Sequence, residues 1–305
     1  MIIAIPGSWP SSLQDYPVVC RPALPKDTPE VMELTRMLWD GHDYIPLVWA
    51  DWLADPQGLL AVTECGGKVV GTGKLTRLSD QDWWLEGLRV HTKYQGKGIA
   101  SRLNDYLLEV WLRSGGGTVR LATSSIRLPV HHLCERSGFS RITEFSAFAA
   151  PVIAETTDNF NLVAASEISE ALAYALNNQS LGWSAGLMDL GWQWASPRES
   201  FLIEAVRKGQ AWWFQGRRGL LVIWEDEEDQ ETRPAISLVA CPAADLASLL
   251  LDFRRLAWKC GYQQAIWNAP LHPELLPALS ESGFQRDWDE SMYIYARPHP
   301  NIEDR

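Results

Sequence analysis

The feature that most constrains the fold of this 305-residue chain is a strand, a glycine-bearing loop and a helix that follow one another directly. An apolar stretch ends at Val90, Gly96 and Gly98 flank a lysine, and a helical pattern runs from about Gly98 to Arg113. Glycines let a ligand approach the backbone closely, and the free N–H groups at a helix start attract anions. The tract therefore predicts an α/β fold with a phosphate site at the start of an amphipathic helix, whose apolar face holds Ile99, Leu103, Tyr106, Leu107 and Val110.

Two common phosphate-binding loops do not fit this tract. No Lys-Ser or Lys-Thr pair follows Gly98, as a P-loop requires, and the three-glycine dinucleotide fingerprint is missing. The flanking sequence has the alternation of antiparallel strands at 58–64, 68–75 and 83–90, and a further strand and helix follow at 119–122 and 129–136. We therefore expect a mixed α/β fold, of the α+β kind, with antiparallel hairpins first and a strand–helix–strand crossover after them.

Two tracts that lie 145 residues apart share one local pattern. A helical segment ends at Ser137-Gly138-Phe139 and another at Ser282-Gly283-Phe284, and an alternating strand follows each. Glycine at such a position favours the left-handed helix cap. Because the spacing is about one domain long, a duplicated fold is the simplest account, with domains at residues 1–152 and 153–305. Coincidence is the alternative, since helix, glycine and strand form a common succession.

The loop is similar to the acetyl-CoA loop of the GNAT acetyltransferase superfamily, whose motif is Arg/Gln-x-x-Gly-x-Gly/Ala. Gln95, Gly98 and Ala100 occupy its positions, and the likeness extends over roughly residues 18 to 149. It implies two tandem GNAT-like acyl-CoA N-acyltransferase domains, and direct transfer of acetyl from acetyl-CoA to a primary amine in a ternary complex. The resemblance also implies the residues that contact acetyl-CoA: Leu88, Arg89 and Val90 by strand backbone, and Gln95, Gly96, Lys97, Gly98, Ile99, Ala100 and Ser101 around the pyrophosphate.

Acetyl transfer needs a base, because an alkylammonium has no lone pair and is the main form of an amine at neutral pH. Glu86 is the candidate. At period two it shares a strand face with Trp84, Leu88 and Val90, where burial would bring its pKa toward the working pH. A carboxylate paired with an arginine at the sheet surface is the alternative reading.

The departing thiolate needs a proton in return, and here the chain departs from the family pattern. The family tyrosine would fall four residues before Gly138, where Cys134 stands, and the family asparagine is replaced by Arg127. Cys134 is thus a candidate proton donor, and a small buried core cysteine is the competing interpretation. A tyrosine from another loop, or water, stays open as the donor.

The loop after the first helix covers the acceptor pocket in this family. Here it offers Asp40 or Asp43 for an ammonium group and His42 and Tyr44 as further contacts, although turn chemistry explains Asp-Gly equally well. The run Gly41-x-Asp43-Tyr44-Ile45-Pro46 and the run Glu86 to Val90 resemble the histidine N-acetyltransferase group, which would make the acceptor the α-amino group of a small amino acid such as histidine. Polyamine and aminoglycoside acceptors remain alternatives, as does an acetyl-CoA sensor without turnover.

The second half lacks both loop glycines in the corresponding tract, Val239 to Leu246, so we expect a degenerate domain without the pyrophosphate loop. It is also the acidic half: residues 151–305 carry 12 basic and 22 acidic side chains, against 15 and 16 in residues 1–150. A net charge of −11 without a basic stripe argues against nucleic acid as a partner, and no apolar run is long enough for a membrane span.

The five cysteines are scattered and form no C-x-x-C pair, so the sequence predicts neither a disulfide framework nor a metal site. Reduced thiols and the lack of a basic, apolar leader favour a cytoplasmic protein. We expect a small-molecule amine as the partner, and a monomer with internal pseudo-symmetry rather than a homodimer.

Overall fold

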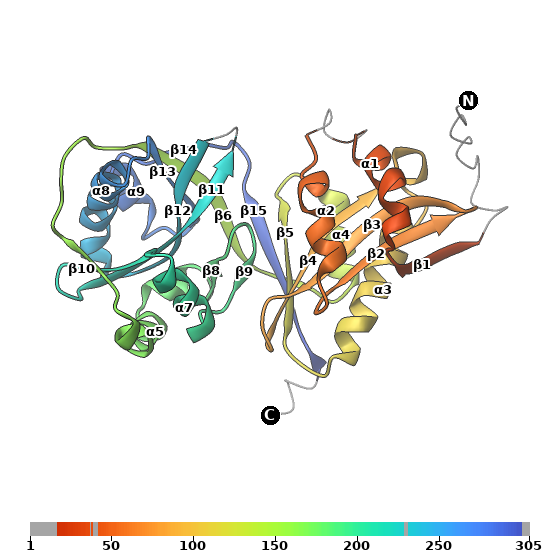
Figure 1. The fold of residues 1–305 in the computed structure, drawn as a ribbon, viewed down its shortest axis with the longest axis horizontal. Coiled ribbons are helices and arrows are strands. Elements are labelled where there is room, and N and C mark those ends of the chain that lie inside the picture. Colours follow the sequence, from red (N-terminus) through yellow and green to blue (C-terminus); the bar gives the residue numbers. More distant parts are fainter. Residues whose placement is uncertain (1–16, 37, 39–41, 229–230, 301–305) are drawn as a thin grey trace. The chain divides into compact units, whose positions relative to one another are not determined.

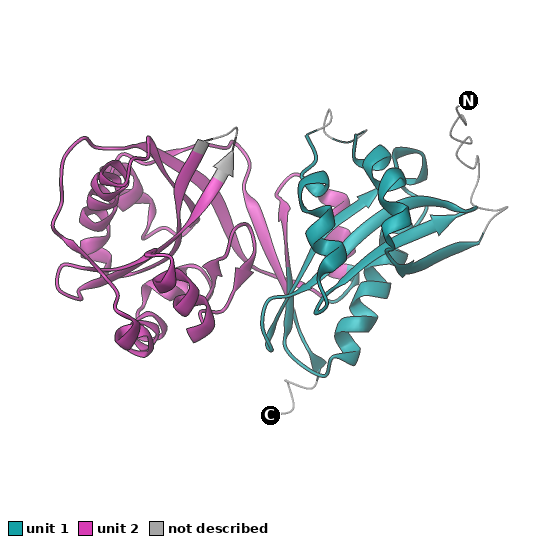
Figure 2. Cartoon of the chain, viewed as in Figure 1, with its two compact units in different colours: residues 1–120, 136–138, 297–305 teal, residues 121–135, 139–296 magenta. Residues whose placement is uncertain are grey.

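The computed structural model describes residues 17–36, 38, 42–228 and 231–300. The chain divides into two compact units, drawn in teal and magenta in Figure 2. Unit 1 contains residues 1–120, 136–138 and 297–305, and unit 2 contains residues 121–135 and 139–296. The division into two domains at residues 152 and 153 remains a prediction, because compact units alone do not establish that each part folds independently.

Unit 1 is built on a sheet whose strands follow the order β1-β2-β3-β4-β5, antiparallel as far as β4 and parallel between β4 and β5 (Figure 1). The strands are β1 Val18–Pro22, β2 Leu59–Cys65, β3 Lys68–Arg77, β4 Asp82–Val90 and β5 Thr118–Ser124, of which β5 continues into unit 2. The helices are η1 Pro25–Asp27, α1 Thr28–Arg36, α2 Ile45–Ala54, η3 Thr92–Tyr94 and α3 Ile99–Arg113.

Helices cover both faces of this sheet. On one face, α1 and α2 pack on the strands through a cluster that includes Val31, Trp49 and Val62. On the other face α3 lies very close to β3. A Cβ added to Gly73 of β3 would lie only 3.2 Å from the Leu107 side chain of α3. The small residue at that point permits the helix to pack on the strand backbone. The predicted helix over 98–113 is confirmed, since α3 spans Ile99–Arg113.

Unit 2 has a sheet in the order β15-β6-β13-β12-β11-β10-β7, with β14 pairing β6. Its main strands are β6 Ser140–Pro151, β7 Phe160–Leu162, β10 Ala211–Phe214, β11 Gly219–Glu228, β12 Glu231–Ala240, β13 Gln264–Pro270, β14 Gln285–Arg286 and β15 Met292–Pro298. A separate hairpin joins β8 Met188–Asp189 and β9 Trp194–Ala195. Its helices are α4 Leu128–Arg136, η4 Ala165–Glu167, α5 Ile168–Asn177, α6 Ser180–Trp183, α7 Glu199–Arg207, α8 Ala243–Lys259 and α9 Leu276–Glu281.

The duplicated Ser-Gly-Phe tracts have one geometry. Gly138 and Gly283 adopt φ values of 78° and 76°, the left-handed cap that the sequence predicts. In both cases the phenylalanine N–H donates to the carbonyl five residues earlier, from Phe139 to Cys134 at 3.0 Å and from Phe284 to Leu279 at 2.9 Å. The two helices thus end in the same way, as a duplicated fold requires.

Candidate active site

The loop between β4 and α3 forms the expected cradle of backbone N–H groups. Gly98 caps α3 with φ 78°, and Gly96 has φ 72°. The first bond inside the helix runs from the Arg102 N–H to the Gly98 carbonyl at 3.1 Å, so the N–H groups of residues 99–101 have no acceptor within the helix. A Cβ built on either glycine would meet no heavy atom within 4 Å, so a ligand can reach this stretch of backbone. The cradle fits a diphosphate, because a helix start favours anions.

Side chains around the cradle hold it in place. Tyr94 is fully buried and packs with Ile99 in a small cluster, which ties the loop to the sheet. Gln95 donates from Nε2 to the Val90 carbonyl at 3.2 Å and closes the loop on the end of β4. The Lys97 ammonium lies 5.2 Å from the centre of the Tyr94 ring, a position that adds positive charge beside the cradle. Ile99 points into the core, so it can serve an anion only through its N–H.

The strand β4 is joined to its parallel neighbour along only part of its length. The pairing with β5 involves Asp82–Trp84 and Thr118–Arg120, and an ion pair of 2.6 Å between Arg120 and Asp82, both buried, fixes that end. Residues 85–90 of β4 continue past the paired stretch toward the cradle. An extended ligand could add to this part of the strand as a peptide adds to a sheet edge.

A β-bulge in β4 breaks the regular alternation of side chains that the sequence predicts for this strand. Lys74 of β3 pairs with Glu86, and Thr72 pairs with Arg89, so Gly87 and Leu88 together lie opposite Gly73. Residues that pair directly point to the same face of a sheet, which places Glu86 with Arg89 and not with Leu88 and Val90. Gly87 has φ 65°, and a Cβ there would lie 2.6 Å from the Trp52 ring of α2. Glu86 therefore lies on the face that α1 and α2 cover.

Glu86 is half-buried on this face, and its carboxylate accepts a hydrogen bond from Thr76 Oγ1 at 2.5 Å. Nearby on the same face, the buried Lys74 ammonium forms an ion pair with Asp55 at the end of α2. The face thus combines a carboxylate with a set of fixed charges under apolar helices, an arrangement suited to binding and deprotonating a small polar molecule.

The acceptor-loop residues have different surroundings. Asp43 is buried and binds Arg89 through two hydrogen bonds, to Nε at 2.8 Å and to Nη2 at 3.2 Å, and it also accepts from the Ile45 N–H at the start of α2. Desolvation raises the pKa of Tyr44 to about 12, and its ring packs edge-on against Trp52. His42 is exposed. The prediction for Asp40 lies outside the described residues.

Cys134 lies on α4 in unit 2 and is 2% exposed. Burial raises the pKa of its thiol to about 12, well above the usual range of thiols. Such a thiol stays protonated near neutral pH and gives up its proton reluctantly, which favours the packing interpretation over proton donation.

Sequence reasoning missed a buried histidine–tyrosine pair in unit 2. His131 Nδ1 lies 2.8 Å from the Tyr295 hydroxyl, and both residues are buried. No local signal joins them, since they are 164 residues apart. Among the described residues, no cluster of three or more histidine, cysteine or acidic side chains is arranged to hold a metal ion. No helix in the described part of the chain is long and apolar enough to cross a membrane.

Residues 26–139 match the Acetyltransferase (GNAT) family. The cradle and the open part of β4 both lie within the matched range. Two curated relatives are similar over a short stretch: a histidine N-acetyltransferase of Oreochromis niloticus, 30% identical over 89 residues, and an N-acetylaspartate synthetase of Danio rerio, 30% identical over 86 residues. The stretches cover 29% and 28% of this chain, and 26% and 30% of those relatives, so the chain spans less than a third of their length.

Solved structures are similar over nearly the whole chain. A GCN5-related N-acetyltransferase from Sphaerobacter thermophilus gives a TM-score of 0.62 at 12% identity, covering 92% of this chain and 95% of that one. A tandem GNAT protein from the clavulanic acid biosynthesis pathway gives 0.58 at 11% identity, covering 93% and 99%. At such identities the likeness concerns the fold, and it confirms the predicted mixed α/β class with tandem GNAT-like domains.

Proposed function

We propose that the chain is an N-acetyltransferase that transfers acetyl from acetyl-CoA to a primary amine of a small molecule. The observation that carries this is the cradle at residues 95–101, an open helix start that follows a strand with an unpaired stretch of edge, in a region that matches the GNAT family. The backbone of Leu88–Val90 would bind the pantetheine arm, and the N–H groups of the cradle would bind the diphosphate.

Glu86 is the base in this proposal. The amine lone pair attacks the thioester carbonyl carbon, the C–N bond forms, the C–S bond breaks, and CoA leaves as its thiolate. The proton that the amine loses passes to the Glu86 carboxylate, directly or through one water, and the thiolate takes up a proton. Thr76 holds the carboxylate in place through its hydroxyl. The ion pairs Lys74–Asp55 and Arg89–Asp43 lie on the same face of the sheet.

The acceptor in this proposal is the α-amino group of an amino acid such as histidine. It is supported by the similarity to a histidine N-acetyltransferase over 89 residues and by the polar face beneath α2. Because Asp43 is bound to Arg89, it positions α2 and that arginine, and Tyr44 and Glu86 are left as the groups that an acceptor would contact.

A thiol-release assay with acetyl-CoA tests both levels of the proposal. The panel contains histidine, histamine, a polyamine and an aminoglycoside, and histamine differs from histidine only in lacking the carboxylate. We expect release with histidine and weaker release with histamine. Release with another amine alone would keep the activity and overturn the acceptor, whereas binding of acetyl-CoA without release on any amine would favour a sensor.

Glu86→Gln supplies the test of the base. We expect kcat to fall by roughly 100-fold or more with the affinity for acetyl-CoA unchanged, since a general base contributes roughly 10²–10⁴-fold. Glu109→Gln is the matched control, because Glu109 is an exposed carboxylate on α3 paired with Arg113. Equal activity of the two variants would exclude Glu86 as the base.

A further inference from the structure

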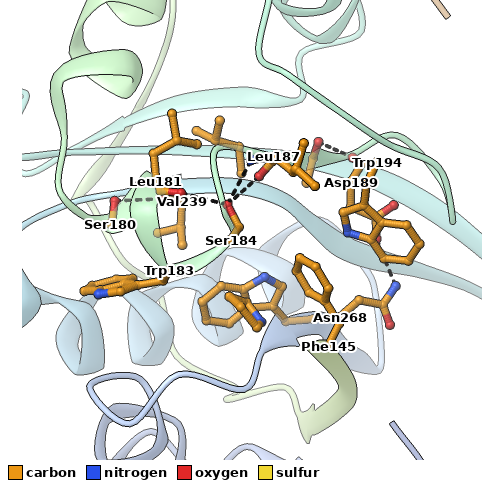
Figure 3. Close-up of a pocket in the computed structure, with 14 residues that line it drawn as sticks. Phe145, Ser180, Leu181, Trp183, Ser184, Leu187, Asp189, Trp194, Val239 and Asn268 are labelled. Carbon is orange, nitrogen blue, oxygen red and sulfur yellow. Dashed lines mark hydrogen bonds between the residues drawn. The ribbon is translucent and has the colours of Figure 1, made fainter. Parts of the chain in front are cut away.

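Unit 2 contains a pocket of its own, at the point where its parallel strands separate. The strands β12 and β13 pair in parallel at Ala235 and Ile266, and the residues that follow on each strand line the pocket together with α6 and the β8–β9 hairpin. Figure 3 shows Asp189 and Asn268 near Trp194 at one end, and Ser180 and Trp183 at the other. The pocket encloses about 370 Å³ of empty space, including the part that opens to solvent.

A buried carboxylate forms one wall of this pocket. Asp189 is 3% exposed and accepts hydrogen bonds from Asn268 Nδ2 at 2.9 Å and from the N–H groups of Gly191 and Trp192 at 2.9 and 2.8 Å. Among the described residues it forms no ion pair, and its charged neighbour Asp226 is itself an acid, bound to Arg233. Burial raises the pKa of Asp189 to about 7. A cation inside the pocket would supply the missing counter-charge.

The hydroxyls that line the pocket have already used their single proton. Ser180 donates to Asn178 Oδ1 at 2.8 Å, Ser184 donates to the Leu187 carbonyl at 2.6 Å, and Ser237 donates to the Asp189 carbonyl. A hydroxyl that donates its proton presents only lone pairs to a ligand. These hydroxyls therefore accept hydrogen bonds, which suits a ligand that only donates them.

Size and aromatic rings limit the ligand further. Without movement of the side chains, the pocket has room for a group of about the size of one water molecule, which is also the size of an ammonium head. Aromatic faces attract such a cation, and four aromatic side chains line the pocket: Phe145, Trp183, Trp194 and Trp267. The remaining empty space toward solvent leaves room for a short carbon chain.

We propose that the pocket of unit 2 is a binding site for a small primary alkylammonium ion, whose head is held by the Asp189 carboxylate and the Ser237 hydroxyl oxygen of β12. The site is separate from the cradle and from Glu86, which belong to unit 1, and it needs no acetyl-CoA.

Ethylammonium is the probe, titrated into the full chain at pH 8 and followed by ligand-detected NMR and by tryptophan fluorescence. We expect saturable binding of ethylammonium, no comparable binding of ethanol or acetate, and exclusion of tetramethylammonium, which is too large for the head site. Asp189→Asn should weaken binding at least tenfold, because the amide keeps the hydrogen bonds of the hairpin but not the charge. Asp252→Asn is the matched control, a buried acid of α8 that already has Arg255 as its partner.

Because the proposed acetyl acceptor is also an amine, the titration is repeated with Glu86→Gln, and the Asp189-dependent signal should persist there. Three results would each overturn the proposal. They are ethanol binding as tightly as ethylammonium, ethylammonium binding that Asp189→Asn leaves undiminished, and no saturable ethylammonium binding by the folded protein up to about 100 mM. If Asp189→Asn fails to fold, Trp194→Phe replaces it and should weaken ethylammonium binding by reducing the aromatic surface beside Asp189. A chain that binds ethylammonium but never releases thiol from acetyl-CoA would keep this site and lose the proposed enzyme.

Discussion

Arg89 on β4 and Asp43 at the start of α2 bind each other through two hydrogen bonds, although 46 residues separate them in the sequence. The two side chains are only 10% and 1% exposed, so neither charge is well solvated. The pair ties the strand that carries Glu86 to the helix that covers it.

Replacing Asp43 by asparagine should destabilise the fold strongly, since it leaves the Arg89 charge buried without its counter-charge. We expect the free energy of unfolding to fall by about 3 kcal/mol in urea titrations. Glu33→Gln, which breaks an exposed ion pair with Arg36, is the control and should change it by less than about 1 kcal/mol. A loss for Asp43→Asn no larger than that of the control would mean that the pair contributes little.

Gly98→Ala should damage the cradle more than the fold. A side chain at φ 78° costs about 1–2 kcal/mol, and relief of that strain would move the N–H groups at the start of α3. We expect the affinity for CoA to fall at least about tenfold by calorimetry. Gly115→Ala is the matched control at the opposite end of α3, where φ is 86° and a Cβ also meets nothing within 4 Å. It should lose similar stability and keep CoA affinity; equal affinities of the two variants would place the diphosphate elsewhere.

The cysteines should differ in reactivity according to burial. Cys134 and Cys241 are buried, and burial raises the pKa of each thiol to about 12, so neither forms much thiolate at pH 8. We expect N-ethylmaleimide to label the exposed Cys260 first, and the other two only after unfolding, as read by peptide mass spectrometry. Rapid labelling of Cys134 in the folded chain would favour it again as a candidate proton donor. If it is a core residue instead, Cys134→Ala should keep most of the activity.

Asp189 should make stability depend on pH in a direction opposite to that of an ion-paired acid. Its pKa is about 7 in the folded chain and near 4 when unfolded, so the folded state holds the proton more tightly. Its contribution is present in full below about pH 4 and is lost as pH rises through 7. We expect the stability of the wild type relative to Asp189→Asn to fall between pH 5 and pH 8 in urea titrations. A difference that stays constant across this range would show that Asp189 is ionised throughout.

Local sequence was sufficient to predict the cradle. Gly96 and Gly98 both need left-handed dihedrals, and the helix that follows has its apolar residues at regular spacing, so loop, cap and helix are all determined within about twenty residues. The matching caps at Gly138 and Gly283 were predictable for the same reason.

The surroundings of Glu86 depend on tertiary contacts and could not be predicted in this way. A period-two pattern continues through residue 87 in the sequence, and only the approach of Trp52 to the Gly87 backbone shows why a bulge lies there. The pairing of Asp43 with Arg89 depends on that bulge. Asp189 could not be recognised from the sequence, because a single acid two residues before a glycine resembles many turns until the fold brings Asn268 and the aromatic side chains beside it.

The extra residue in β4 has a consequence for how such a chain can change. If all four residues 86–89 paired regularly with β3, residues 86 and 89 would project to opposite sides of the sheet, one toward α2 and one toward α3. A change that straightened the strand without removing a residue would therefore separate the carboxylate from the arginine with every side chain still present. The chemistry of this strand depends as much on its backbone conformation as on the identity of its residues, and a comparison of related chains by residue type alone would overlook that difference.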